Sequence, residues 1–149
     1  MRGRLLAAAI LVAAAIPAVA LAISAAMSPV VSAKLVGKTE VPKGSPTGSG
    51  TVVLHLDAKT GRVCWTFNVG KIDKPTAAHI HKGKVGVAGP VVVPLGFVYK
   101  AKSCINGPSN SKVFADIEKH PSSYYVNVHT AKYPAGAIRG QLVAGTLKG

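Results

Sequence analysis

Hydrophobic and polar residues alternate most regularly in two neighbouring segments, residues 51–57 and 63–69. Alternate positions share one face of a β-strand. The apolar residues that share such a face are Val52, Leu54 and Leu56 in the first segment and Val63, Trp65, Phe67 and Val69 in the second. The residues between the segments, Ala-Lys-Thr-Gly, suit a tight turn. The pattern therefore predicts a β-hairpin with one buried face.

Further strands are predicted by short apolar or alternating runs bounded by Gly, Pro and Ser. They cover residues 34–41, 77–81, 91–95, 124–130 and 137–143. Apolar residues at helical spacing predict one short helix over residues 112–119, with Ser109 or Ser111 as its N-cap and Pro121 beyond its end. Residues 96–110 are expected to be irregular apart from Cys104. Short strands, one helix and no internal repeat predict an all-β fold, an antiparallel Greek-key β-sandwich.

The N-terminal segment has the pattern of an export signal. Arg2 and Arg4 precede an apolar, alanine-rich run over residues 5–23. Small residues at the spacing of a cleavage site end at Ala20, Ala22, Ala26 and Ala33. We expect a signal peptide over residues 1–33, a single domain over residues 34–149, and a secreted or extracytoplasmic protein without a membrane span after cleavage. The alternative is a retained N-terminal anchor.

The chain has two cysteines, Cys64 and Cys104. In an exported protein an even number of cysteines indicates disulfide bonding, and we expect one bridge. Closing a loop of about 40 residues stabilises a fold by roughly 3–4 kcal/mol in the chain-entropy model. The alternative is a pair of thiolate metal ligands, but the chain has no Cys-x-x-Cys motif.

The protein is strongly basic, with a formal net charge of +13 over 149 residues. Its fourteen lysines and four arginines are scattered singly, whereas a nucleic-acid site would favour clustered arginines with stacking aromatics. We expect a monomer with a solvated cationic surface and no specific nucleic-acid partner. An anionic envelope component or a small anion would be attracted to that surface.

Three histidines are candidates for a metal site. In a strand over residues 77–81, His79 and His81 project from one face, and His129 lies in the strand predicted over residues 124–130. Three imidazoles suit copper in both oxidation states, and copper is favoured over zinc, which the same ligands would also bind. Asn127 shares a face with His129 and would hydrogen-bond within the site. The alternative is that all three histidines are structural and that the protein has no cofactor.

Two blocks of sequence resemble the CHRD domain, a module named after chordin and found in exported bacterial proteins. The blocks are Thr76-Ala77-Ala78-His79-Ile80-His81 followed by Ala88-Gly89-Pro90-Val91-Val92, and Tyr125-Val126-Asn127-Val128-His129-Thr130 followed by Ile138-Arg139-Gly140-Gln141-Leu142. The resemblance covers roughly residues 33–144. It implies an extracellular β-sandwich whose molecular function is poorly defined.

The first block is also distantly similar to the copper strand of Cu/Zn superoxide dismutases. The sandwich expected for this chain is thus of the superoxide dismutase-like or immunoglobulin-like type. That similarity implies His79, His81 and His129 as copper ligands and Arg139 as an anion guide. No counterpart exists for the bridging histidine or the zinc ligands, because His55 and His120 fall outside the matching stretches. The leading hypothesis is thus an exported, non-catalytic binding module that holds one metal ion. The alternatives are a copper-only dismutase-like enzyme and a purely structural envelope protein.

Overall fold

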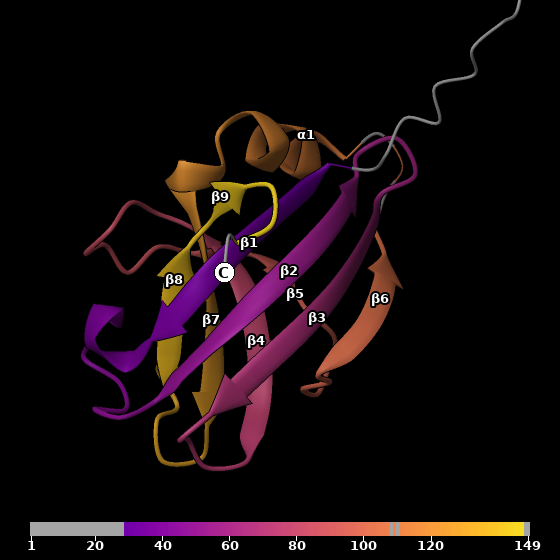
Figure 1. Cartoon of the computed structure of the whole chain (residues 1–149). Coiled ribbons are helices and arrows are strands. Elements are labelled where there is room, and N and C mark those ends of the chain that lie inside the picture. The colour runs from indigo at the N-terminus through magenta and orange to yellow at the C-terminus, as the bar shows by residue number, and fades with distance from the viewer. Residues whose placement is uncertain (1–28, 108, 110, 148–149) are drawn as a thin grey trace, which may run out of the picture.

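The computed structural model describes residues 29–107, 109 and 111–147, drawn in colour in Figure 1. The expected signal peptide falls almost entirely on residues 1–28, which lie outside the described part. Within the described ranges, no helix is long and apolar enough to cross a membrane.

Short strands make up most of the described chain. They are β1 (Val30–Val36), β2 (Ser49–Asp57), β3 (Arg62–Gly70), β4 (Pro75–Lys82), β5 (Val91–Pro94), β6 (Lys102–Asn106), β7 (Tyr124–Thr130), β8 (Ile138–Gln141) and β9 (Val143–Ala144). The helices are the 3-10 turns η1 (Gly37–Thr39) and η2 (Pro121–Ser123) and the α-helix α1 (Lys112–Lys119).

The strands form one antiparallel sheet in the order β5-β4-β7-β8-β1-β2-β3-β6, with β9 beside β1. The sheet curls so that β1, β2 and β3 lie in front of β4 and β7 (Figure 1). β1, β2 and β3 are successive neighbours, and β8 returns to lie beside β1, so the order β8-β1-β2-β3 is a Greek-key arrangement. β8 joins the halves by pairing with β1 at Val36 and Arg139. The all-β Greek-key sandwich with one short helix is confirmed.

The core fills the space between the halves and follows the alternation of the sequence. From β2 and β3 it receives Val52, Leu54, Leu56, Val63, Trp65 and Phe67, all at most 5% exposed. From β4 it receives Ala78 and Ile80, which are 1% and 0% exposed. Alternation along β4 places His79 and His81 on one face, as predicted, and that face is turned away from the core.

Two predictions about strand boundaries were wrong. The first strand was predicted over residues 34–41, but β1 begins at Val30 and ends at Val36, and it pairs with β2 from Val30↔His55 to Val36↔Ser49. Residues 102–106, expected to be irregular, form β6 along the edge of β3. The sequence of β6 shows little apolar alternation, because Ile105 is its one partly buried apolar residue that packs against the core.

The expected disulfide is present and joins the two strands of that edge. Cys64 and Cys104 are direct register partners in β3 and β6, and their Cα atoms lie 4.0 Å apart. The bridge therefore fastens the outermost strand of this half to its only neighbour in the sheet.

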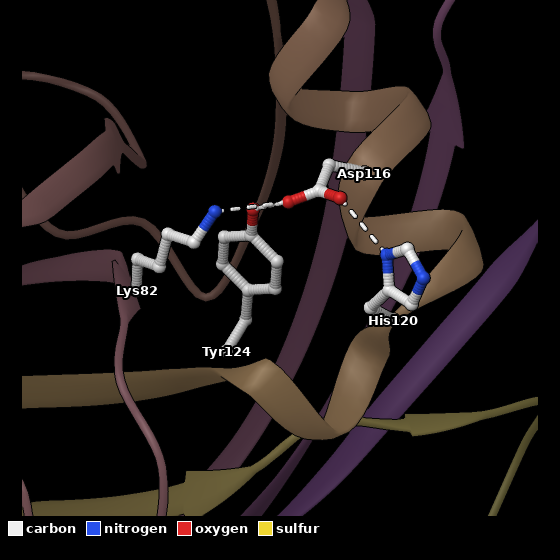
Figure 2. Close-up of polar contacts among 4 residues, drawn as sticks. All are labelled: Lys82, Asp116, His120 and Tyr124. Carbon is white, nitrogen blue, oxygen red and sulfur yellow. Dashed lines mark hydrogen bonds and ion pairs between the residues drawn. The ribbon is translucent and has the colours of Figure 1, made fainter.

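Helix α1 was predicted with its observed bounds, and Ser111 is its N-cap. A cluster of polar side chains holds it against the sheet, as Figure 2 shows. Lys82 Nζ lies 3.1 Å from Asp116 Oδ2, the Tyr124 hydroxyl donates to the same oxygen, and His120 Nδ1 lies 2.9 Å from Oδ1. Hydrogen bonds from Tyr124, His120 and Lys82 hold the pKa of the Asp116 carboxyl well below its usual range. One carboxylate thus links the helix to both β4 and β7.

Candidate metal centre

The register of β4 and β7 brings the three candidate histidines together. His79 lies directly opposite Asn127, and Ala77 lies opposite His129. These side chains occupy the face of the β4–β7 pair that is turned away from the core. His81 is nevertheless only 8% exposed, because the loop over residues 83–90 folds over it. The site is a partly covered patch on the outside of the sandwich.

The ring nitrogens lie close to one another. His79 Nδ1 is 2.9 Å from His129 Nε2, and one nitrogen from each of the three rings lies within 4.8 Å of the others. An ion bound about 2.0–2.1 Å from each imidazole nitrogen holds those nitrogens about 3–4 Å apart. Small rotations of the rings would therefore bring all three to ligand distance.

Backbone carbonyls fix the tautomers of two of the rings. His81 Nδ1 lies 2.9 Å from the Gly89 carbonyl oxygen, and His129 Nδ1 lies 2.9 Å from the Pro134 carbonyl oxygen. A carbonyl oxygen only accepts, so each Nδ1 carries the proton and donates. Each neutral ring is left with a lone pair on Nε2, which faces His79 Nδ1 in the case of His129 and Asn127 Oδ1 in the case of His81. Such second hydrogen bonds orient histidine ligands in metal sites.

The Asn127 side chain lies between these two rings. Its Oδ1 is 3.1 Å from His81 Nε2 and 3.0 Å from His129 Nε2. With Nδ1 protonated, the Nε2 atom of each of these two neutral rings is an acceptor, so neither ring has a proton to donate to the amide oxygen. A bound cation would offset the repulsion between the lone pairs of these acceptor atoms. Turning the amide by 180° would instead present its NH₂ group to both rings and satisfy them without a metal.

Protonation of the rings is disfavoured in this environment. Burial, followed by the neighbouring His129 and His81, lowers the pKa of His79 from 6.5 to about 4. Burial also lowers the pKa of His129. Near neutral pH these two rings are therefore unprotonated, which is the form that binds a metal ion.

Known families give a match for most of the chain. The family described as the CHRD domain matches residues 31–142. The chain belongs to the CHRD domain family. No curated protein and no solved structure matches, so the distant likeness to Cu/Zn superoxide dismutases has no support from relatives.

Arg139 of this CHRD domain lies under the loop beside the histidines. It is 2% exposed, and its guanidinium donates to the carbonyl oxygens of Val87 and Lys84 at 3.0 and 3.3 Å. The guanidinium carbon lies 3.7 Å from the centre of the Tyr125 ring, which stacks on His81 with 4.7 Å between ring centres. The arrangement links Arg139, Tyr125 and His81 in one stack that holds the loop over the site.

Sequence reasoning missed Glu40 as a neighbour of the site. Its side chain is 4% exposed, and its Oε1 has no hydrogen-bond partner among the described residues. Burial raises the pKa of Glu40 to about 7, although the charge of Arg139 and hydrogen bonding from Asn127 lower it in part. A lone glutamate ahead of a proline gives no sequence signal of such burial. The CHRD domain therefore has a buried carboxyl behind the asparagine that contacts two of the histidines.

Asp57 and His120 make their contacts elsewhere in the fold. Asp57 accepts from the backbone amides of Lys59 and Thr60 in the β2–β3 turn. His120 is bound to Asp116, as described above. Neither joins the histidine cluster of the CHRD domain.

Proposed function

We propose that this CHRD domain is an extracytoplasmic binding module that holds one transition-metal ion at His79, His81 and His129. The observation that carries the proposal is the convergence of three ring nitrogens within 4.8 Å, two of them with tautomers fixed by backbone carbonyls. Asn127 completes the group as a neighbour of two rings.

Copper is the metal that we favour. The three candidate ligands are all imidazoles, which suit both copper and zinc, and copper(II) binds nitrogen sites more tightly than zinc in the general order of affinities. A bound copper ion would supply one-electron redox chemistry. We propose binding rather than catalysis because Arg139, the residue expected to guide an anion, is buried and donates to backbone carbonyls.

The test is metal stoichiometry on the purified, disulfide-bonded domain. We expect one copper per chain for the wild type and a loss of affinity of at least about tenfold for His81→Ala and His129→Ala. His120→Ala is the matched control, because this exposed histidine directly follows α1 and contacts Asp116 instead. Unfolding curves for each variant separate loss of binding from loss of the fold.

Absence of copper binding by the folded wild type, or equal binding by His81→Ala and the wild type, would remove the site. The copper-loaded protein is also tested for superoxide consumption. Rates no faster than those of the same copper free in buffer reject the dismutase-like alternative.

We also propose export with removal of an N-terminal signal. The disulfide fits an oxidising compartment, and the basic, then apolar start of the chain fits a signal. Among the candidate sites, cleavage after Ala33 would remove half of β1, where Ala33 pairs with Val52. We therefore expect the mature N-terminus upstream of Val30, and mass spectrometry of the exported protein checks it.

A further inference from the structure

The loop between β5 and β6 presents apolar side chains to solvent. Phe97 is fully exposed, at 107% of its reference area, and Val98 next to it is 62% exposed. Among the residues that the structure describes, the other large hydrophobic side chains exposed to solvent are all valines. We give the name tip loop to residues 95–102, which comprise this loop and Lys102 at the start of β6.

The tip loop is held in place on both sides of these residues. Leu95 N donates to Ala78 O at 3.0 Å, and Tyr99 N donates to Thr76 O at 3.0 Å. The Trp65 indole donates to the Lys100 carbonyl at 2.8 Å. Phe97 is therefore directed outward by a chain that is fixed before and after it.

Some side chains of the tip loop pack against the core, and Phe97 does not. The Tyr99 ring packs against Phe67 with 5.5 Å between ring centres, and Leu95 is 1% exposed. Phe97, two residues from each, has its aromatic surface left in water. Gly96, with φ at +89°, makes the turn that allows this.

The tip loop carries exposed lysines and lies in a stretch of sequence without acidic residues. Lys100 and Lys102 are both exposed, and no Asp or Glu occurs between Asp73 and Asp116, a stretch that contains six lysines. The whole chain carries a formal net charge of +13. An anionic surface would thus meet apolar and positive groups together at this loop.

We propose that the tip loop docks this protein onto the surface of an anionic lipid bilayer. Phe97 and Val98 would enter the boundary between headgroups and acyl chains, while Lys100 and Lys102 remain among the anionic headgroups. A stable protein interface buries roughly 800 Å² on each partner. Two exposed apolar side chains supply much less area than that. A soft, charged lipid surface needs no such matched area.

The test is flotation of the metal-free protein with vesicles, in EDTA, so that its outcome is independent of the histidine site. Vesicles contain phosphatidylcholine alone or equal parts phosphatidylcholine and phosphatidylglycerol. We expect binding to the anionic vesicles only, at least tenfold weaker for Phe97→Ser, and weaker in 0.5 M than in 0.05 M NaCl.

Matched controls separate the tip loop from general charge. Val98→Ser is compared with Val143→Ser on β9, and Lys100→Glu with Lys38→Glu on η1; all four residues are exposed. We expect the tip-loop variant of each pair to weaken binding more. Absence of binding to anionic vesicles, equal losses within both pairs, or unchanged binding by Phe97→Ser each overturns the proposal.

Discussion

Glu40→Gln is expected to make the protein more stable at neutral pH and to change how its stability depends on pH. The wild-type carboxyl is 4% exposed, and burial raises its pKa from 4.5 to about 7. The folded protein therefore holds this proton more tightly than the unfolded chain does. The tighter binding of this proton contributes to the free energy of unfolding. That contribution is complete below about pH 4.5 and is lost as pH rises to about 7.

The size of the effect follows from the shift in pKa. At about 1.4 kcal/mol per pH unit, raising the pKa from 4.5 to about 7 corresponds to about 3 kcal/mol. The solvent relaxes around the ionised group and reduces this cost. We therefore expect the difference in free energy of unfolding between Glu40→Gln and the wild type to grow by about 2 kcal/mol from pH 5 to pH 8.

The assay is urea unfolding at pH 5, 6, 7 and 8 in EDTA, followed by tryptophan fluorescence. Trp65 is the single tryptophan and is 2% exposed, so its emission reports loss of the core. The lowered pKa values of His79 and His129 act in the opposite direction, because their protonation at acid pH favours the unfolded chain. Both proteins share this contribution, so the difference between them isolates Glu40.

The matched control is Asp57→Asn, the same change of a carboxyl to an amide. Asp57 is partly exposed at the end of β2, and hydrogen bonds from Thr60 lower its pKa. It is ionised in both states above pH 5, so the difference between this variant and the wild type is expected to stay constant. A constant or shrinking difference for Glu40→Gln over the same range would refute the assignment of a buried, protonated carboxyl.

Three further changes probe the fold and the site. Gly89→Ala is expected to cost at least about 2 kcal/mol in urea unfolding, because its Cβ would lie 1.7 Å from the Lys82 carbonyl oxygen; a variant as stable as the wild type contradicts this close approach. Replacing Cys64 and Cys104 together by alanine is expected to lower the free energy of unfolding by about 2–4 kcal/mol, and a loss below about 1 kcal/mol would mean that the bridge does little for stability. Asp116→Asn is expected to lower the melting temperature at pH 7, with a deficit that shrinks as pH falls below the ordinary carboxyl value of 3.8; a deficit unchanged at pH 3 argues against a role for its charge.

The strands that were predicted well are those whose alternation reflects burial on one face. β2 and β3 carry apolar residues at every second position because these side chains fill the core. β6 has one partly buried apolar residue in the core and lies at an edge, so its pairing depends on β3 and not on its own pattern. The start of β1 was missed because Val30 and Val31 lie close to the apolar N-terminal run and were assigned to the same segment as that run.

The candidate site was predicted in part for a similar reason. Alternation in β4 placed His79 and His81 on one face, but only the pairing of β4 with β7 shows that His129 reaches them. Glu40 could not be found, because its burial results from contacts between segments far apart in the sequence. Its carboxyl lies where a Cβ on Gly136 would come within 2.2 Å of it.

The two ends of the described domain are bonded to each other. Gly145 N donates to the Val30 carbonyl at 2.7 Å, and Ser32 Oγ donates to the Gly145 carbonyl at 2.7 Å. Val36, at the other end of β1, lies about 20 Å along the strand and pairs with Arg139 in the row that contains the site. In a longer polypeptide, the segments before and after this domain would therefore join it side by side. The histidines lie away from that point of attachment.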